Sequence, residues 1–162
     1  MWGLAGSLVL FGLYLTSLYS YLLFHTLVEL FSIVVAAAIF VVVWNAWRML
    51  DNGYLLFLGI SFLFVALLDA LHTLAYEGMG VFPDHGADLP TQLWIASRYL
   101  QAIAFLAAPA FLTIRLRATW ILAGGILIVT LILASIFVWP IFPQAYVEGQ
   151  GLTPFKIVSE YV

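Results

Sequence analysis

The chain has 162 residues, of which 65% are hydrophobic and only 8% are charged, and its mean hydropathy is +1.14. Soluble domains carry about a quarter charged residues, so this composition excludes a water-soluble fold and predicts an all-α, polytopic bundle of transmembrane helices. The net charge of -3 and the absence of cysteine exclude a basic surface for nucleic acid, disulfides and thiolate metal sites.

Runs of about 20 apolar residues are long enough to cross the hydrocarbon core of a bilayer, and five such runs are present. The polar stretch from Thr16 to Tyr21 divides a long N-terminal apolar region in two, because the undivided region is too long for one span. A Leu-Asp-Asn-Gly turn at residues 50–53 precedes the third run. We therefore predict five full spans at about residues 2–20, 22–47, 54–76, 91–114 and 119–138.

A sixth helix is predicted to begin after Gly151, with Thr153 as its N-cap and Pro154 in its first turn. It reaches Val162 and is then too short to cross the membrane. We expect residues 1–162 to form a single membrane-embedded domain that is truncated at its C-terminus. A cleaved signal peptide is the alternative for the first span, but no Lys or Arg precedes that apolar run and no A-x-A site closes it.

The basic residues near the ends of the predicted spans indicate the orientation of the chain. Arg48 lies between the second and third spans, and Arg115 and Arg117 lie between the fourth and fifth. Cytoplasmic loops are enriched in Lys and Arg, so we expect these loops and the N-terminus to be cytoplasmic. The opposite, outer loops carry the acidic residues Glu77, Asp84, Asp88 and Glu148.

Ionisable residues inside the predicted spans lie in one layer. A helix rises 1.5 Å per residue, which places these residues within about 6 to 12 Å of the outer surface. On the second and third spans they are spaced four and three residues apart, so that each pair shares one helix face. Such residues usually face the bundle interior, where they pair with each other. The layer consists of His25 and Glu29 on the second span, Asp69 and His72 on the third, and Arg98 on the fourth with Trp94 one turn above it.

We predict that these six residues form a ligand-binding site. Four of them, His25, Glu29, Asp69 and His72, form a tentative metal-ligand set that suits zinc, iron or manganese. The sequence leaves three other chemistries open: a haem held by the two histidines, a metal-free site in which Arg98 pairs with a carboxylate or holds an anionic or quinone-like ligand, and a histidine pair that reports external pH.

No nucleotide-binding loop, nucleophile triad or phosphoryl-transfer motif is visible, so the chain is not expected to be an enzyme. Two further readings stay open. The chain could be a redox or transport subunit that handles haem or protons, although the cytoplasmic half of spans two to four offers only polar groups such as Asn45 and Ser61. It could also be a structural bundle whose buried ion pairs fix the register of the helices.

Several motifs follow one another in an order that resembles the third type of bacterial membrane-associated sensor domain. They are Phe24-His25-Thr-Leu-Val-Glu29 with its continuation to Ile33, Tyr54–Ile60, Leu68-Asp69-Ala-Leu-His72 with its continuation to Pro83, Thr91-Gln-Leu-Trp94-Ile-Ala-Ser-Arg98-Tyr and Gly151-Leu-Thr-Pro-Phe-Lys156. The resemblance implies a sensory module in the bacterial inner membrane that precedes cytoplasmic PAS, histidine kinase or diguanylate cyclase domains, in two-component or cyclic di-GMP signalling.

The expected partners are the lipid bilayer, an unidentified small ligand and, by the resemblance, the cytoplasmic signalling domains of the full protein. Sensors of this kind commonly form homodimers, but the sequence has no G-x-x-x-G motif that would locate an interface. The resemblance does not identify the stimulus.

Overall fold

The computed structural model describes residues 2–50 and 52–161. Met1, Asp51 in the predicted turn, and Val162 at the predicted end of the sixth helix lie outside the described residues. The elements, in chain order, are α1 (Trp2–Tyr19), α2 (Tyr21–Ala46), the 3₁₀ turn η1 (Trp47–Met49), α3 (Gly53–Ala75), α4 (Asp88–Ala107), the 3₁₀ turn η2 (Ala108–Phe111), α5 (Ala118–Phe137), β1 (Tyr146–Val147), β2 (Gly151–Leu152) and α6 (Pro154–Glu160).

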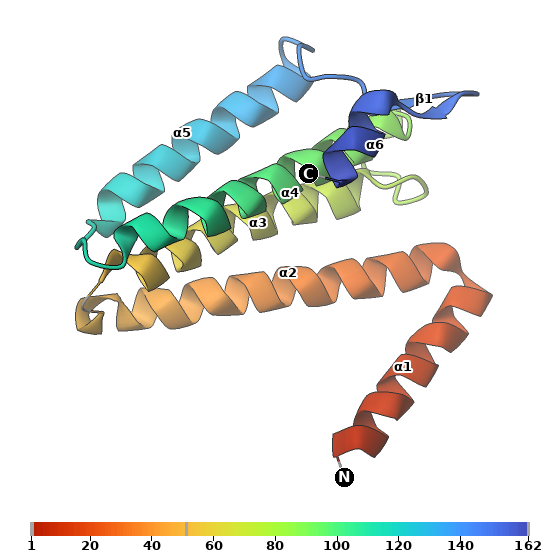
Figure 1. Ribbon diagram of the computed structural model, residues 1–162. Helices are drawn as coiled ribbons and strands as arrows, with labels where there is room; N and C mark the ends of the chain where they lie inside the picture. Colours follow the sequence, from red (N-terminus) through yellow and green to blue (C-terminus); the bar gives the residue numbers. More distant parts are fainter. Residues whose placement is uncertain (1, 51, 162) are drawn as a thin grey trace.

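Helix α3 is the centre of the bundle. It lies beside both α2 and α4 and runs antiparallel to them, while α5 packs on the same group (Figure 1). Ile60 and Leu68 on α3 are fully buried, as are Leu93 and Ile95 on α4. Helix α1 contacts α2 near their junction and then projects away from the bundle (Figure 1). The site described below therefore depends on how α2, α3 and α4 are rotated against each other.

Two predicted helix starts are confirmed by their capping contacts. Ser20 has extended backbone angles, φ −155° and ψ 117°, and its hydroxyl accepts a hydrogen bond from the backbone N of Leu23. A polar side chain at this position ends α1 and begins α2, because it satisfies a donor that has no partner inside the helix. Thr153 caps α6 in the same way by accepting from the backbone N of Lys156.

The fourth helix differs from its prediction at both ends. It begins at Asp88, with Pro90 in its first turn, and ends at Ala107 instead of near residue 114. The chain then forms η2, which contains Pro109. Proline lacks the N–H that an α-helix would use and its ring crowds the preceding turn, so the regular helix stops before it. The predicted continuation to residue 114 is therefore wrong.

Within the part of the chain that the structure describes, three helical segments are long and apolar enough to cross a membrane, namely Tyr21–Met49, Gly53–Ala75 and Ala118–Phe137. The apolar part of α1, Gly3–Tyr19, is shorter than these three. Helix α4 has 20 residues, but Gln92, Arg98 and Gln101 make it more polar than its neighbours. The chain is therefore a membrane protein with at least three segments suited to spanning, and the full count of five stays a prediction.

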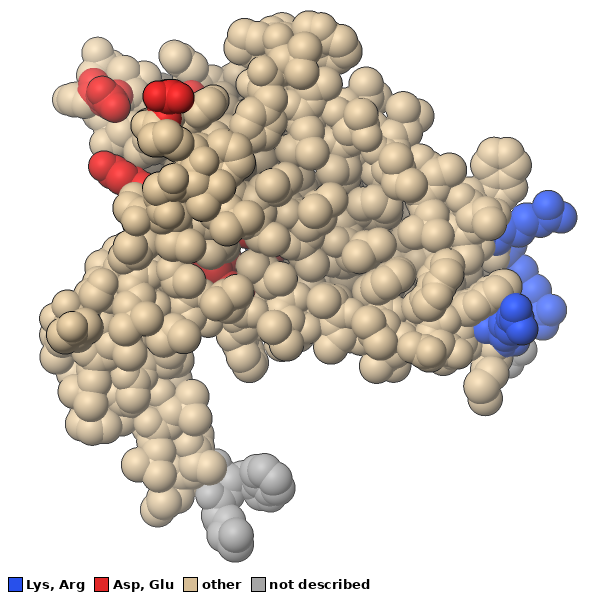
Figure 2. All heavy atoms as spheres, turned by 180° about the vertical axis from the view of Figure 1, so that it is seen from behind, with Lys and Arg blue, Asp and Glu red and all other residues tan. Residues whose placement is uncertain are grey.

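The exposed charges of the loops separate along the bundle. Figure 2 shows exposed basic side chains at one end and acidic side chains at the other, while Arg98 and Lys156 lie among the helices nearer the acidic end. Arg48 in η1, and Arg115 and Arg117 before α5, belong to the basic end. The acidic end carries the loop after α3 and the segment after α5. The middle of the bundle is apolar and its two ends carry opposite exposed charges, which agrees with the membrane orientation predicted from the loops.

The segment after α5 folds back onto the first turns of α4. The Asp88 carboxylate Oδ1 accepts hydrogen bonds from the backbone N atoms of Ala145 and Tyr146, at 2.7 and 2.8 Å. The Gln92 amide donates to two backbone carbonyls of the same segment, at 3.3 and 3.1 Å. Strands β1 and β2 then form an antiparallel ribbon, which the sequence analysis did not predict. These contacts hold the ribbon and α6 beside α4, at the acidic end.

Candidate functional site

Toward the acidic end, α2, α3 and α4 bring the predicted ionisable residues into two adjoining clusters. The first, which we call the ion-pair cluster, consists of Asp69, Ser97, Arg98 and Gln101. The second, which we call the imidazole cluster, consists of His25, Glu29 and His72. The two clusters meet on α3, where Asp69 and His72 lie one helical turn apart on the same face.

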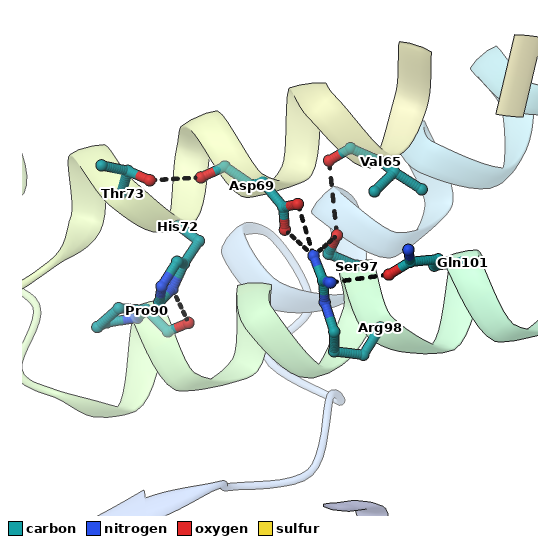
Figure 3. Close-up of polar contacts among 8 residues, drawn as sticks. All are labelled: Val65, Asp69, His72, Thr73, Pro90, Ser97, Arg98 and Gln101. Carbon is teal, nitrogen blue, oxygen red and sulfur yellow. Dashed lines mark hydrogen bonds and ion pairs between the residues drawn. The ribbon is translucent and has the colours of Figure 1, made fainter. Parts of the chain in front are cut away.

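In the ion-pair cluster, the guanidinium of Arg98 on α4 points at α3 (Figure 3). Its Nη2 donates to both carboxylate oxygens of Asp69, at 2.6 and 2.5 Å, and its Nη1 donates to Oε1 of Gln101 at 2.7 Å. Ser97 Oγ accepts a further bond from Nη2 at 3.3 Å. Arg98 is thereby oriented by two residues of its own helix and by one of α3.

The carboxylate of the ion pair is buried, where the loss of hydration is unfavourable. Asp69 is only 2% exposed, and the side chain of Arg98 is 36% exposed. A carboxylate in an apolar interior is strongly unfavourable unless a cation and hydrogen bonds offset the lost hydration. Arg98 and Asp69 also line a cleft of about 210 Å³ between α2, α3 and α4. The pair therefore links α3 to α4, and its two polar side chains form part of the lining of that cleft.

In the imidazole cluster, one potential ligand atom from each of His25, Glu29 and His72 lies within 4.8 Å of the other two. The two imidazole rings meet edge to face, with their centroids 5.5 Å apart. His72 is 5% exposed, and His25 and Glu29 are half-buried. In the described residues, the Nε2 atoms of both histidines are buried and have no hydrogen-bond partner.

The tautomer of His72 follows from its neighbour on α4. Its Nδ1 lies 2.8 Å from the backbone carbonyl oxygen of Pro90 (Figure 3). A carbonyl can only accept, so Nδ1 carries the proton and donates, which leaves a lone pair on Nε2. A hydrogen bond of this kind is how proteins commonly fix the ring of a metal-binding histidine. The Nε2 of His72 therefore faces the cluster as an acceptor or a ligand.

Two tyrosines enclose His25. The Tyr76 ring lies 3.9 Å from the His25 ring, centroid to centroid, and the Tyr21 ring stacks at 6.2 Å on the same imidazole. Tyr76 follows the last residue of α3, where burial and the nearby Tyr21 phenol raise the pKa of its hydroxyl above the ordinary value. The Tyr76 hydroxyl is therefore protonated at neutral pH. Its ring packs against that of His25, which is half-buried.

The predicted set of four metal ligands is divided by the structure. Asp69 is committed to Arg98, so His25, Glu29 and His72 remain as a group of three. Two imidazoles and one carboxylate are a donor set that suits zinc and other first-row transition metals. The ligand roles of all these residues stay predictions.

Trp94 lies against two basic side chains. The Arg98 guanidinium carbon lies 5.9 Å from its ring centroid, and Nζ of Lys156 on α6 lies 3.6 Å from it. Lys156 is buried and also pairs with Glu160 one turn later on α6. The indole ring of Trp94 thus connects the ion-pair cluster to the C-terminal helix.

Sequence reasoning missed three residues of this region, which are Tyr76, Gln101 and Lys156. Gln101 lies three residues after Arg98, and Tyr76 lies four after His72, so helical spacing alone offered a signal for both. Lys156 approaches Trp94 from 62 positions further along the chain. No local pattern indicates such a contact.

Comparisons with known proteins agree with the resemblance seen in the sequence motifs. A family model described as a membrane-associated sensor domain, MASE3, matches residues 16–162, which is nearly the whole chain. The match covers α2 to α6 and therefore both clusters. The chain has no significant match among curated proteins or among solved structures.

Proposed function

Because this chain belongs to the MASE3 family of membrane-associated sensor domains, we propose that it detects a ligand or metal through the two clusters among α2, α3 and α4. In this proposal the domain is the sensory input of a bacterial signalling protein. It is not catalytic itself, and its output lies in cytoplasmic domains of the full protein.

One observation carries this proposal. Five ionisable side chains from three helices gather toward one end of a bundle whose composition is only 8% charged. A single ion pair would be enough to fix the register of two helices. The imidazole cluster adds two buried, unpartnered nitrogen atoms to that pair, and unpaired polar groups lower stability in an apolar interior. Groups that cost stability are typical of a site that serves function.

The finer topology is part of the proposal. The N-terminus and the basic loops lie in the cytoplasm, α1 to α5 each cross the bacterial inner membrane, and α6 begins a sixth helix. Both clusters then lie near the outer face. The separation of exposed basic and acidic side chains of the loops to opposite ends of the bundle supports this orientation (Figure 2).

The structure suggests how binding would be transmitted. A ligand shifts a conformational equilibrium only if it binds one helix packing more tightly than the other. Binding at the imidazole cluster draws α2 toward α3, and the ion-pair cluster links α3 to α4 one turn away. Trp94 and Lys156 then link α4 to α6. Typical coupling free energies of about 1–3 kcal/mol are within reach of such contacts.

A haem-binding or proton-handling subunit is the competing function. A porphyrin held by both histidines would lie between the two rings. Those rings already meet edge to face at 5.5 Å, and Tyr76 lies against His25, so the geometry favours a smaller ligand or a single ion. A purely structural bundle is the second competitor, and the unpartnered Nε2 atoms argue against it.

The test uses the native signalling protein in membranes, joined to its own output domain. Glu29→Gln, Asp69→Asn and Arg98→Ala are introduced one at a time, with Asp84→Asn and Arg48→Ala as controls at exposed positions. We expect altered output from each of the first three variants and unchanged output from the controls. Unchanged output in all three site variants, at equal protein level, would contradict a sensory role for the site.

A further inference from the structure

The structure places three metal-binding groups so that they can share one ion. We infer that His25, Glu29 and His72 bind a single divalent transition-metal ion of the zinc type, through the Nε2 atoms of both imidazoles and the Glu29 carboxylate, with a fourth position left open. This inference rests on the proposed sensory function and names the class of ligand for one of its two clusters.

The spacing of the donors supports one shared ion. Zinc lies about 2.0–2.2 Å from nitrogen and oxygen ligands in tetrahedral sites, so neighbouring donors are about 3.3 Å apart. The donor atoms of the imidazole cluster lie within 4.8 Å of each other. Small rotations of the three side chains close this difference. Neither Nε2 atom has a hydrogen-bond partner in the described residues, so neither is engaged by a protein group that would compete with a metal.

The surroundings of the cluster favour a metal over a proton. His72 donates from Nδ1 to the Pro90 carbonyl, which directs its Nε2 lone pair toward the cluster. His25 is held between the Tyr21 and Tyr76 rings. In residues 2–50 and 52–161, Glu29 forms no ion pair with a basic side chain. The two imidazoles are thus oriented before binding, and the Glu29 carboxylate is not held by an ion pair in the described residues.

Charge indicates what the fourth position accepts. Arg98 neutralises Asp69, so among the described residues of the two clusters Glu29 carries the remaining formal charge. A divalent ion bound to Glu29 leaves one positive charge uncompensated. In an apolar interior this charge favours an anionic fourth ligand, such as hydroxide or a small carboxylate. Exchange of that ligand gives the site a means to respond to its surroundings.

The experiment measures metal binding by the intact chain in detergent. The protein is stripped with a chelator and titrated with Co²⁺, whose visible bands report tetrahedral coordination, and Zn²⁺ is then added as a competitor. We expect one ion per chain and displacement of Co²⁺ by Zn²⁺. His25→Ala, Glu29→Gln and His72→Ala should each weaken binding by more than about a hundredfold, because loss of a direct ligand exceeds the tenfold to hundredfold effect of a supporting group.

Two variants guard against misfolding and surface binding. His85→Ala removes the exposed loop histidine and should bind Co²⁺ as the wild type does. His25→Cys keeps a ligand and, because the chain has no other cysteine, any thiolate-to-cobalt charge-transfer band reports this position alone. Absence of that band, together with Co²⁺ binding that survives His25→Ala and His72→Ala, would overturn the inference.

The metal inference and the sensory proposal fail in different ways. If the wild type binds neither Co²⁺ nor Zn²⁺ while Glu29→Gln changes the output of the native signalling protein, the metal inference is wrong and the sensory role stands. If the ion binds as expected while none of the site variants changes the output, the sensory role is wrong and the metal site stands.

Discussion

Nη2 of Arg98 on α4 donates to both carboxylate oxygens of Asp69 on α3, at 2.6 and 2.5 Å. This contact determines the chemistry of the whole site. It removes Asp69 from the set of potential metal ligands. The ion-pair cluster, which links α3 to α4, is therefore separate from the imidazole cluster. The two parts can therefore be tested independently.

Breaking the ion pair from one side should destabilise the bundle. Arg98→Ala leaves Asp69, which is 2% exposed in the native protein, without its cation, and we expect this to lower the free energy of unfolding by about 3 kcal/mol. This is the lower end of the range for buried pairs, since Arg98 itself is partly exposed. Thermal or denaturant unfolding in detergent measures the change. Arg48→Ala, at the exposed basic end, is the matched control.

Replacing both partners should be less harmful than replacing one. In Asp69→Leu with Arg98→Met, neither side chain carries a charge, and similar apolar replacements of buried pairs are often neutral or stabilising. We expect the double variant to unfold at a higher temperature than Arg98→Ala. A double variant less stable than Arg98→Ala would show that the pair is retained for the stability of the fold.

Two neighbouring glycines of α5 should respond differently to the same substitution. A Cβ at Gly125 would approach the ring of Phe64 on α3 to 2.0 Å, whereas a Cβ at Gly124 meets nothing within 4 Å. Gly125→Ala should therefore cost about 1–3 kcal/mol through overpacking. Gly124→Ala should leave stability unchanged or raise it, since alanine favours the helix. Thermal unfolding of the two variants side by side checks the packing of α5 on α3.

The docking of α6 should depend on the cation at position 156. Lys156→Met removes the ion pair with Glu160 and the contact of Nζ with the Trp94 ring, and such a ring contact is worth about 0.5–2 kcal/mol, more as it is desolvated. We expect hydrogen exchange of the α6 amides to become about tenfold faster, as 1.4 kcal/mol corresponds to that factor. Lys156→Arg retains a cation and should exchange as the wild type does. Equal exchange in all three proteins would mean that other contacts, such as Tyr99 to Ser159, hold α6 in place.

The orientation can be tested with single cysteines, because the chain has none of its own. Asp84→Cys lies in the predicted outer loop and Arg117→Cys in the predicted cytoplasmic loop. A membrane-impermeant maleimide should label the first variant in intact cells, and the second only after the membrane is opened. The reverse pattern would invert the topology and place both clusters near the cytoplasm.

Several helix boundaries could be predicted because their causes are local. Ser20 ends one helix and begins the next through its own hydroxyl, and Thr153 with Pro154 begins α6 through a cap and a fixed φ angle. The end of α4 was predicted several residues too far along the chain. Pro109 was present in the sequence, but the apolar run continued past this proline. The ribbon was missed because two-residue strands have too few positions to form a pattern.

The sequence by itself determined that the chain belongs in a membrane, since so few charges and so much apolar surface suit no aqueous fold. It also predicted that His25, Glu29, Asp69, His72 and Arg98 lie at similar heights along the bundle, because the rise per residue of a helix is constant. Only the tertiary structure decided which of these side chains meet. Their pairing depends on the rotation of α2 and α4 about α3, and that rotation is set by side-chain packing along the whole length of the helices.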